Sequence, residues 1–514
     1  MNLSDRFARQ LEIFASWRRT VGRGSAVFGI VVGLLVGVLV AALVVPSGSD
    51  DAETIGGVGS GQGDSGFGAG ESVDDGGTSE GGAVDAPVEG GGPAQPAGGG
   101  GGSSTAGGVS GGTQAGDAPS ERARGVTDDA IKIGVALLDL GAVRQLGPAF
   151  DNGDRRRHFE SILEGWRRRG LLPVNGRDVR FVYRSYGVLS LEEQRAACVG
   201  LVQDEQVFAV VADSRFHLSG AECVAREFRT PLILHDGPAD PVFARGHPFL
   251  FSVQMSEDRL LRNLIHWAHG RGVLTGKKIG IYYEDQQQIR AQMDRTVKAE
   301  LKRLGHELAA EVSTAQTLGG PRDAVAVQQF QGNGVQVAML FTSKAGFMQQ
   351  AQAQRYRPTY LESDYSSGTT NTATSTYPAE HFDGTFGMSG LRVGEWKSNM
   401  AAPPPAEECV SDYQRTSGNR IEPNAREAEY IAMNKACDAA RVLLYALRAL
   451  GRDVTPARLV GAVESLSEIP MGIAPPVTFG PDRHHGVTRQ RTVQWSAGCQ
   501  CWRAQGQFAP LLVP

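Results

Sequence analysis

The residues with the most distinctive chemistry in this chain are its six cysteines, Cys198, Cys223, Cys409, Cys437, Cys499 and Cys501. Cysteine thiolates either bind zinc or oxidise to disulfides, and their spacing helps to separate the two cases. Cys499 and Cys501 are separated by a single residue, whereas paired zinc ligands are usually separated by about two to four residues. An even number of cysteines in an exported domain is typical of disulfides. We therefore expect disulfides and no bound metal, although His484 and His485 lie nearby in the sequence.

Sequence order alone leaves the disulfide connectivity open, because six cysteines can pair in about fifteen ways. We favour Cys198–Cys223, Cys409–Cys437 and Cys499–Cys501. The first bridge would join two consecutive predicted helices. The second would tie a loop to the helix that follows it.

A second group of chemically capable residues stands where predicted strands end. Its members are Ser214, His235, Asp236, Glu284, Ser343, Asp364 and Tyr365. In open α/β sheets, ligands bind beyond the carboxyl ends of the strands. The same residue types are also common in turns and at helix caps, so that interpretation stays open for each of them. The chain lacks the G-x-S-x-G, HExxH and P-loop motifs and has no G-x-G-x-x-G after its first strand, so we expect neither catalysis nor a cofactor.

The elements that would position these residues alternate between strands and helices. Residues 131–138 form a near-continuous apolar run, which is typical of a strand buried on both faces. Phe159, Ile162, Leu163 and Trp166 then follow at the spacing of an amphipathic helix. Short turns between strand and helix indicate right-handed crossovers and parallel sheets, and two such runs predict two lobes. Further strands are expected at 178–186, 207–212, 231–234, 249–253, 278–283, 335–342, 358–361 and 384–391, with a proline-rich loop and long helix after them and a final hairpin from 477 to 495.

The N-terminal part of the chain has a different composition. Residues 25–45 contain no charge, are long enough to span a bilayer and follow five arginines. We therefore expect a cytoplasmic tail at 1–24, a transmembrane helix at 25–46 and everything after it outside the cell. A cleavable signal peptide is the alternative, although its apolar part is usually shorter. Residues 47–118 contain 26 of the 67 glycines, eleven acidic residues and no lysine or arginine, so we expect a disordered linker.

The charge distribution argues against nucleic-acid binding. The whole chain has a net charge of −5, but the linker alone carries −11. The remaining charges are of mixed sign, and no basic stripe with interleaved aromatic residues stands out.

Several stretches resemble one known family, and their order along the chain strengthens the resemblance. They read IKIGVALLDLG, NGRDVRFVYRSY, EEQRAACVGLVQDEQVFAVVAD, ARVLLYALRALG and VTFGPDRHHG. This order is similar to that of the type I periplasmic binding proteins, specifically the branched-chain amino-acid (Leu/Ile/Val) receptors of ABC importers. The resemblance implies two Rossmann-like lobes joined by a three-segment hinge. Lobe 1 would comprise 129–252 and 392–475, and lobe 2 would comprise 253–391 and 476–514.

The resemblance also carries implications for function. It implies an extracytoplasmic solute-binding protein that captures a small molecule for an ABC-type permease or another membrane protein. Cys198 and Cys223 resemble a disulfide that many members have in the first lobe. Asp364 and Tyr365 match the region where amino-acid receptors keep an acidic partner for the ligand ammonium, and we expect Asp364 to face the cleft without supporting the core.

One loop departs from the family pattern. Family members usually have a Gly/Ser-rich loop after the third strand, whereas residues 212–220 here are bulkier and charged. A ligand carboxylate fits this loop only if Arg215 points inward. The alternative function is a sensor or scaffold ectodomain that signals through a separate membrane partner.

Overall fold

The structure is a computed structural model that describes residues 123–514 apart from 188–189, 316–319, 393, 399 and 514. The predicted tail, transmembrane helix and linker lie outside the described residues. Within the described part of the chain, no helix combines the length and apolar character needed to cross a membrane.

The first lobe is built on a five-stranded parallel sheet in the order β2-β1-β3-β4-β5. Strands β1, β3, β4 and β5 are mainly runs of buried apolar residues, as expected for a sheet covered on both faces, whereas the edge strand β2 is largely half-buried and carries charged residues. The strands are β1 (Ala130–Asp139), β2 (Asp178–Gly187), β3 (Ala209–Ala212), β4 (Leu232–Leu234) and β5 (Leu250–Ser252).

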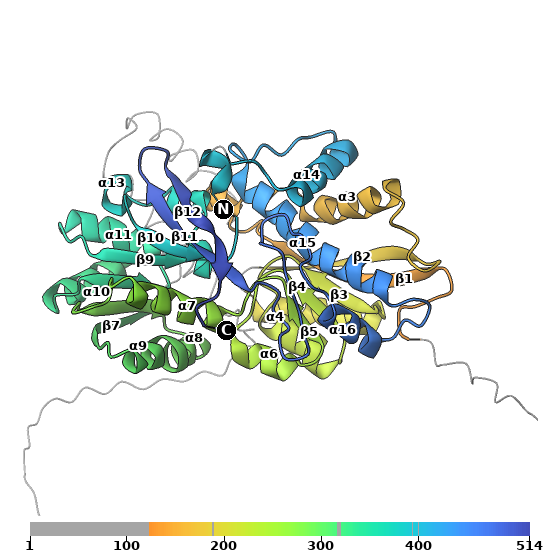
Figure 1. Ribbon diagram of the computed structural model, residues 1–514, viewed down its shortest axis with the longest axis horizontal. Helices are drawn as coiled ribbons and strands as arrows, with labels where there is room; N and C mark the ends of the chain where they lie inside the picture. Colours follow the sequence, from red (N-terminus) through yellow and green to blue (C-terminus); the bar gives the residue numbers. More distant parts are fainter. Residues whose placement is uncertain (1–122, 188–189, 316–319, 393, 399, 514) are drawn as a thin grey trace, which may run out of the picture. The chain divides into compact units, whose positions relative to one another are not determined.

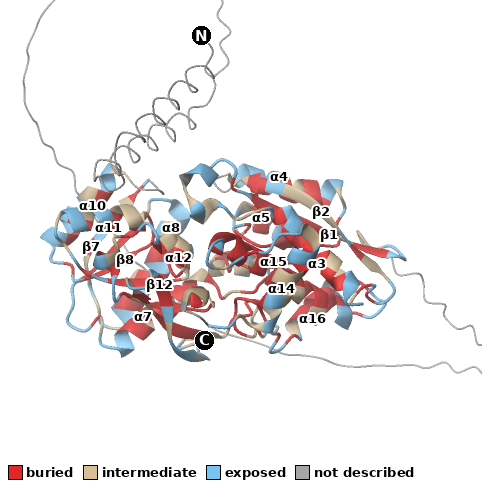
Figure 2. Ribbon diagram, turned by 90° about the horizontal axis from the view of Figure 1, so that it is seen from above, coloured by how far each residue is buried: buried red, intermediate tan, exposed pale blue. Residues whose placement is uncertain are grey.

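Helices from two distant parts of the sequence cover this sheet. Helices α3, α14 and α15 pack on one another, and α15 also contacts β3 and β4 (Figure 1). Most of α15 is buried (Figure 2). The helices of this lobe are α3 (Arg155–Arg168), α4 (Leu191–Val199), α5 (Ser219–Ala221), α6 (Asp240–Gly246), α14 (Pro404–Ser417), α15 (Glu427–Ala449) and α16 (Pro456–Glu464), with π-helical turns continuing α4 to Asp204 and α5 to Glu227.

The second lobe contains a seven-stranded mixed sheet in the order β12-β11-β10-β9-β8-β6-β7. Strands β6 to β10 are parallel, and β11 and β12 form an antiparallel hairpin at one edge. The strands are β6 (Ile279–Glu284), β7 (Leu308–Thr314), β8 (Val337–Leu340), β9 (Thr359–Ser363), β10 (Phe386–Ser389), β11 (Arg489–Ser496) and β12 (Cys501–Pro510). The helices of this lobe are α7 (Glu257–Gly270), α8 (Gln287–Gln292), α9 (Ala299–Arg303), α10 (Pro321–Gly332), α11 (Lys344–Ala353), α12 (Asn371–Thr374) and α13 (Ala379–Phe382).

The chain crosses between the two sheets three times. The first and third crossings run side by side: the Gly486 N–H donates to the Ser252 carbonyl at 2.8 Å, and the Val487 N–H donates to the Val253 carbonyl at 2.9 Å. The second crossing follows β10 near Gly390. The three crossings are short and contain no helix or sheet of their own. Connections of this kind permit hinge motion between two lobes.

The six cysteines pair as Cys198–Cys223, Cys409–Cys437 and Cys499–Cys501, the connectivity favoured from the sequence. The first bridge joins α4 to the π-helical turn that continues α5, so it does link consecutive helices. The second differs from expectation, because Cys409 lies in α14 and not in a loop. Prolines at the start of α14 are compatible with a helix because the first helical N–H groups need no intrahelical partner.

Two further expectations about the fold were wrong. Strand β7 was missed because its sequence, LAAEVST, has a weak apolar pattern, yet it pairs with β6 along its length. The final hairpin consists of β11 and β12, and it begins later than expected. Residues 477–487 instead pair with Ile469 and with the end of β5. The return to lobe 2 therefore lies near residue 488, and not at 476.

Candidate functional site

The first-lobe side of the candidate site is formed by the turns after β3 and β4. His235 is fully buried, and its Nδ1 lies 3.2 Å from Asp236 Oδ1. Lys435 on α15 donates to the same Asp236 oxygen at 2.7 Å. Burial alone would raise the pKa of Asp236, but Lys435 and His235 outweigh it and hold that pKa well below its usual range. Asp236 is therefore a carboxylate whose charge is already compensated within its own lobe.

Gly237, which follows Asp236, allows the first crossing to pass close by. A Cβ atom at this position would lie 1.9 Å from the Met255 carbonyl oxygen, so only glycine fits without displacing the backbone. The end of β4 is thereby held directly against the crossing that leads into lobe 2.

The loop after β3 contributes Arg215 and His217. Arg215 is exposed and adopts a left-handed backbone conformation, with φ of 48°. Burial, aided by the charge of Arg215, lowers the pKa of His217 to about 4, so His217 is neutral at pH 7. The Nδ1 atom of His217 is buried and has no hydrogen-bond partner among the residues that the structure describes. This loop therefore presents one cation and one neutral imidazole with unused hydrogen-bonding capacity.

The second-lobe side of the site is a short chain of hydrogen bonds. The Tyr365 hydroxyl donates to Gln292 Oε1 at 3.4 Å, and Gln292 Nε2 donates to Glu257 Oε2 at 3.2 Å. Burial raises the pKa of Glu257 to about 7, although the hydrogen bond from Gln292 and the charge of Arg215 oppose the rise. Glu257 keeps partial solvent exposure despite dense surroundings. It is an acidic group whose charge is incompletely compensated.

Charges from the two lobes interact with one another at this boundary. Arg215 of lobe 1 acts on Glu257 of lobe 2. Burial raises the pKa of the Tyr365 hydroxyl, Glu257 adds to the rise and Arg215 opposes it. The carboxyl ends of the two sheets therefore bring a cation, a carboxyl group and an aromatic hydroxyl within electrostatic range of each other.

Asp364 occupies a different environment from the one expected. Its carboxylate accepts hydrogen bonds from the hydroxyls of Thr369 and Ser389, the latter at 2.7 Å, and from the Gly390 N–H at 2.7 Å. Burial raises its pKa, while these three donors favour the charged form. Ser389 and Gly390 mark the second crossing, so Asp364 holds the hinge in place. Asp364 was expected to face the cleft without supporting the core, and the structure gives its carboxylate three hydrogen-bond donors beside the second crossing.

The remaining predicted residues divide between the boundary and the lobe interiors. Ser214 is buried, and its carbonyl accepts from the Tyr186 hydroxyl. Glu284 ends β6, and its charge acts on Tyr365, which places it near the boundary. The Ser343 hydroxyl donates to Asp323 Oδ2 at 2.8 Å, at the start of α11, so it is engaged within lobe 2.

Sequence reasoning did not select Glu257, Gln292, His217 or Lys435. Glu257 follows the helix cap Ser256, and an acidic residue there is common because it complements the helix dipole. Lys435 lies inside the long helix α15 and Gln292 ends the short helix α8, and nothing in the local pattern separates either from solvent-facing residues. The sequence offered one indication that Glu257 lies at the lobe boundary, namely its position just after the first crossing and at the start of α7.

Comparisons with known proteins bear on the fold. No family model matches the sequence, and no curated protein is similar to it. Solved structures do resemble it. A branched-chain amino acid ABC transporter protein from Thermus thermophilus, with bound valine, has a TM-score of 0.59 and 12% identity, with 74% of this chain and 97% of that chain covered. A periplasmic binding protein type 1 from Bordetella pertussis Tohama I has a TM-score of 0.56 and 18% identity, with 74% of this chain and 100% of that chain covered.

A third match is a solute-binding protein of an ABC transporter from Rhodopseudomonas palustris HaA2 in complex with p-hydroxybenzoic acid, with a TM-score of 0.58 and 14% identity. It covers 75% of this chain and 98% of that chain. The chain has the type I periplasmic binding protein fold. In this type I fold, Arg215 and Glu257 stand on opposite lobes, each close to a crossing.

Proposed function

We propose that this protein is an extracytoplasmic solute-binding protein that captures a small zwitterionic molecule between its two lobes. The observation that carries the proposal is the electrostatic interaction between Arg215 and Glu257, two oppositely charged groups from different lobes. The charge of neither residue is fully compensated by oppositely charged groups of its own lobe. Incompletely paired charges at the carboxyl ends of α/β sheets are typical of ligand sites.

The chemistry of the two groups defines the ligand class. A guanidinium binds a carboxylate through two parallel hydrogen bonds, so Arg215 is the proposed partner for a ligand carboxylate. Glu257, once ionised, is the proposed partner for a ligand ammonium. Tyr365 supplies an aromatic face with a polar tip beside them. A solute with an amino acid headgroup satisfies all three.

Ligand capture would proceed by closure of the hinge. A ligand shifts the balance between open and closed forms only through the extra contacts that it makes when the lobes close. One pair of contacts between the lobes is already present: Glu427 of α15 accepts from the Asn371 N–H at 3.1 Å and from the Thr372 hydroxyl at 2.7 Å on α12. We assign the protein no catalytic role.

The proposed partner is an ABC-type permease, and the proposed location is the outer face of a membrane. The apolar segment 25–45 would act as an uncleaved anchor with the N-terminus in the cytoplasm. N-terminal sequencing of the mature protein checks this directly. A start at Met1 or Asn2 in the membrane fraction supports the anchor, and a start near Ser47 contradicts it.

A comparison of matched ligands tests the proposed binding chemistry. Purified full-length protein would be titrated with leucine, with leucinamide, which lacks the carboxylate, and with 4-methylpentanoate, which lacks the ammonium. A thermal-shift screen of other amino acids would precede this and replace leucine by the best binder. Removing either charged group should weaken binding by about tenfold or more. Equal binding of all three compounds would contradict a zwitterion site.

A further inference from the structure

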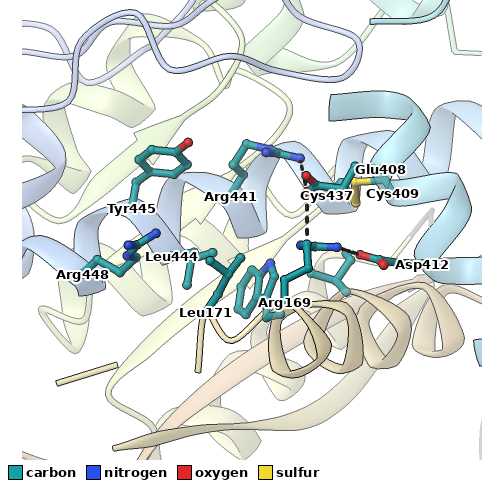
Figure 3. Close-up of a pocket in the computed structure, with 12 residues that line it drawn as sticks. Arg169, Leu171, Glu408, Cys409, Asp412, Cys437, Arg441, Leu444, Tyr445 and Arg448 are labelled. Atoms are coloured by element: carbon teal, nitrogen blue, oxygen red, sulfur yellow. Dashed lines mark hydrogen bonds and ion pairs between the residues drawn. A yellow bond between two sulfur atoms is a disulfide. The ribbon is translucent and has the colours of Figure 1, made fainter. Parts of the chain in front are cut away.

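Lobe 1 contains a cavity of about 220 Å³ on its outer side, away from the crossings. It is bounded by α3 and the residues after it, by α14 and by α15, and it lies beside the Cys409–Cys437 disulfide (Figure 3). This volume exceeds that of a cavity that holds benzene, which is about 150 Å³. The cavity is therefore large enough for a substituted six-membered ring.

One part of the cavity wall is apolar. Ile162, Trp166 and Leu444 line it and are almost completely buried, and Leu171 adds a half-buried side chain. Such a surface favours the apolar body of a ligand.

The acidic groups at the cavity are already paired with arginines. Asp412 accepts from Arg168 at 3.0 Å and also from Arg169. Glu408 lies 3.2 Å from Arg169 and 3.0 Å from Arg441 (Figure 3). These two carboxylates are therefore neutralised locally and do not repel an anion strongly.

Three hydrogen-bond donors at the cavity have no partner among the residues that the structure describes. They are the guanidinium of Arg448, which is exposed, the hydroxyl of the half-buried Tyr445, and the buried Nε–H of Arg441. Residues 441, 445 and 448 are spaced by four and three positions, so they share one face of α15. Figure 3 shows Arg441, Tyr445 and Arg448 in turn along α15, with the guanidinium of Arg441 directed toward Glu408. Unused donors next to an apolar wall are the composition of a site for an amphiphilic anion.

We propose that this cavity binds a small monocarboxylate with a ring-sized apolar body, separately from the site between the lobes. The carboxylate binds Arg448, with Tyr445 and Arg441 as additional donors. The apolar body lies against Trp166 and Leu444. The inference does not depend on the proposed function, because it uses none of the residues at the lobe boundary.

Binding to full-length protein can be measured by ¹⁹F NMR with 4-fluorobenzoate as the probe and 4-fluorobenzamide as its neutral counterpart. For a probe of this size we expect a dissociation constant of about 1 mM or tighter. The amide should bind at least about tenfold more weakly because it lacks the negative charge. Equal binding of the two probes, or no binding of 4-fluorobenzoate, would overturn the proposal.

Substitutions at the rim identify the donors. Arg448→Gln should weaken 4-fluorobenzoate binding by about tenfold or more, and Tyr445→Phe by about threefold. Arg415→Gln is the matched control, because Arg415 is exposed on α14 and does not line the cavity. A loss in the control equal to that in Arg448→Gln would show a general charge effect and would reject the site.

Photolabelling locates the bound probe independently of these variants. Full-length protein would be irradiated with 4-azidobenzoate and digested, and the labelled peptides would be identified by mass spectrometry. Labels on 162–171 or 441–448 support the cavity. Labels confined to peptides containing Arg215, Glu257 or Tyr365 would place the carboxylate between the lobes and overturn this proposal while leaving the proposed function intact.

Discussion

Lobe 2 has two carboxyl groups in contrasting environments, Asp364 at the second crossing and Glu257 at the lobe boundary. They differ in how many hydrogen bonds the surrounding protein donates to them. Burial raises the pKa of both. Asp364 accepts three hydrogen bonds from its own lobe, two of them from the crossing itself. Glu257 accepts one side-chain hydrogen bond within the described residues, from Gln292, and is influenced by the charge of Arg215 on the other lobe.

This difference separates a structural carboxylate from one that is available to a ligand. A buried acceptor whose donors are all supplied by the protein stabilises the fold, and removing it leaves those donors unpaired. A carboxyl group whose pKa lies near 7 and which accepts few hydrogen bonds is stabilised in its charged form when a cationic ligand binds beside it. Replacement of the two groups should therefore change stability in opposite directions.

The largest effect is expected for Asp364→Ala. The substitution leaves the Gly390 N–H and the Thr369 hydroxyl without their acceptor at the hinge. We expect the free energy of unfolding to fall by about 2–4 kcal/mol, measured by urea denaturation of the full-length protein at pH 7. Asp482→Ala removes an exposed aspartate and is the control. An unchanged stability in Asp364→Ala would remove the structural role assigned to this residue.

Glu257→Gln should stabilise the ligand-free protein at high pH. A folded-state pKa of about 7, above the ordinary value of 4.5, means that ionisation of Glu257 destabilises the folded state as pH rises from about 4.5 through 7. We expect the variant to be about 1–3 kcal/mol more stable than the wild type at pH 8, and equal to it at pH 4. Denaturation curves at both pH values check this. Glu192→Gln, an exposed control, should show no such pH dependence.

Lys435→Met tests the compensated pair on lobe 1. The pKa of Asp236 is depressed in the folded state, so the stability that the pair contributes is present above the ordinary pKa of about 3.9 and is lost as pH falls below it. Removing Lys435 should lower the free energy of unfolding by about 1–2 kcal/mol at pH 7. The difference between variant and wild type should shrink toward pH 3. A constant difference at all pH values would indicate lost packing and not lost charge pairing.

Ligand affinity should follow the ionisation of Glu257. Because the ammonium of a zwitterion binds the charged carboxylate, binding should tighten as pH rises from 6 to 8, by up to about tenfold. Glu257→Gln should bind more weakly and with little pH dependence over the same range. Calorimetric titration at three pH values measures both. A wild-type affinity that falls with rising pH would reject Glu257 as the ammonium partner.

The order of elements was predictable because most strands are continuous apolar runs between turns. The role of Asp364 was not, because its donors Ser389 and Gly390 come from a crossing about 25 residues later. The position of a residue at the end of a strand does not show which hydrogen-bond donors from later in the chain will contact it. Glu257 was overlooked for the opposite reason, since an acidic residue in the first turn of a helix is expected on local grounds alone.

The most direct test of ligand capture by both lobes is calorimetric titration of Arg215→Ala and Glu257→Gln with the best ligand from the screen, alongside the exposed controls Arg415→Ala and Glu192→Gln. Each site variant removes a contact from a different lobe. We predict a loss of affinity of about tenfold or more in each site variant and no change in either control. Unchanged affinity in both site variants would contradict binding between the lobes.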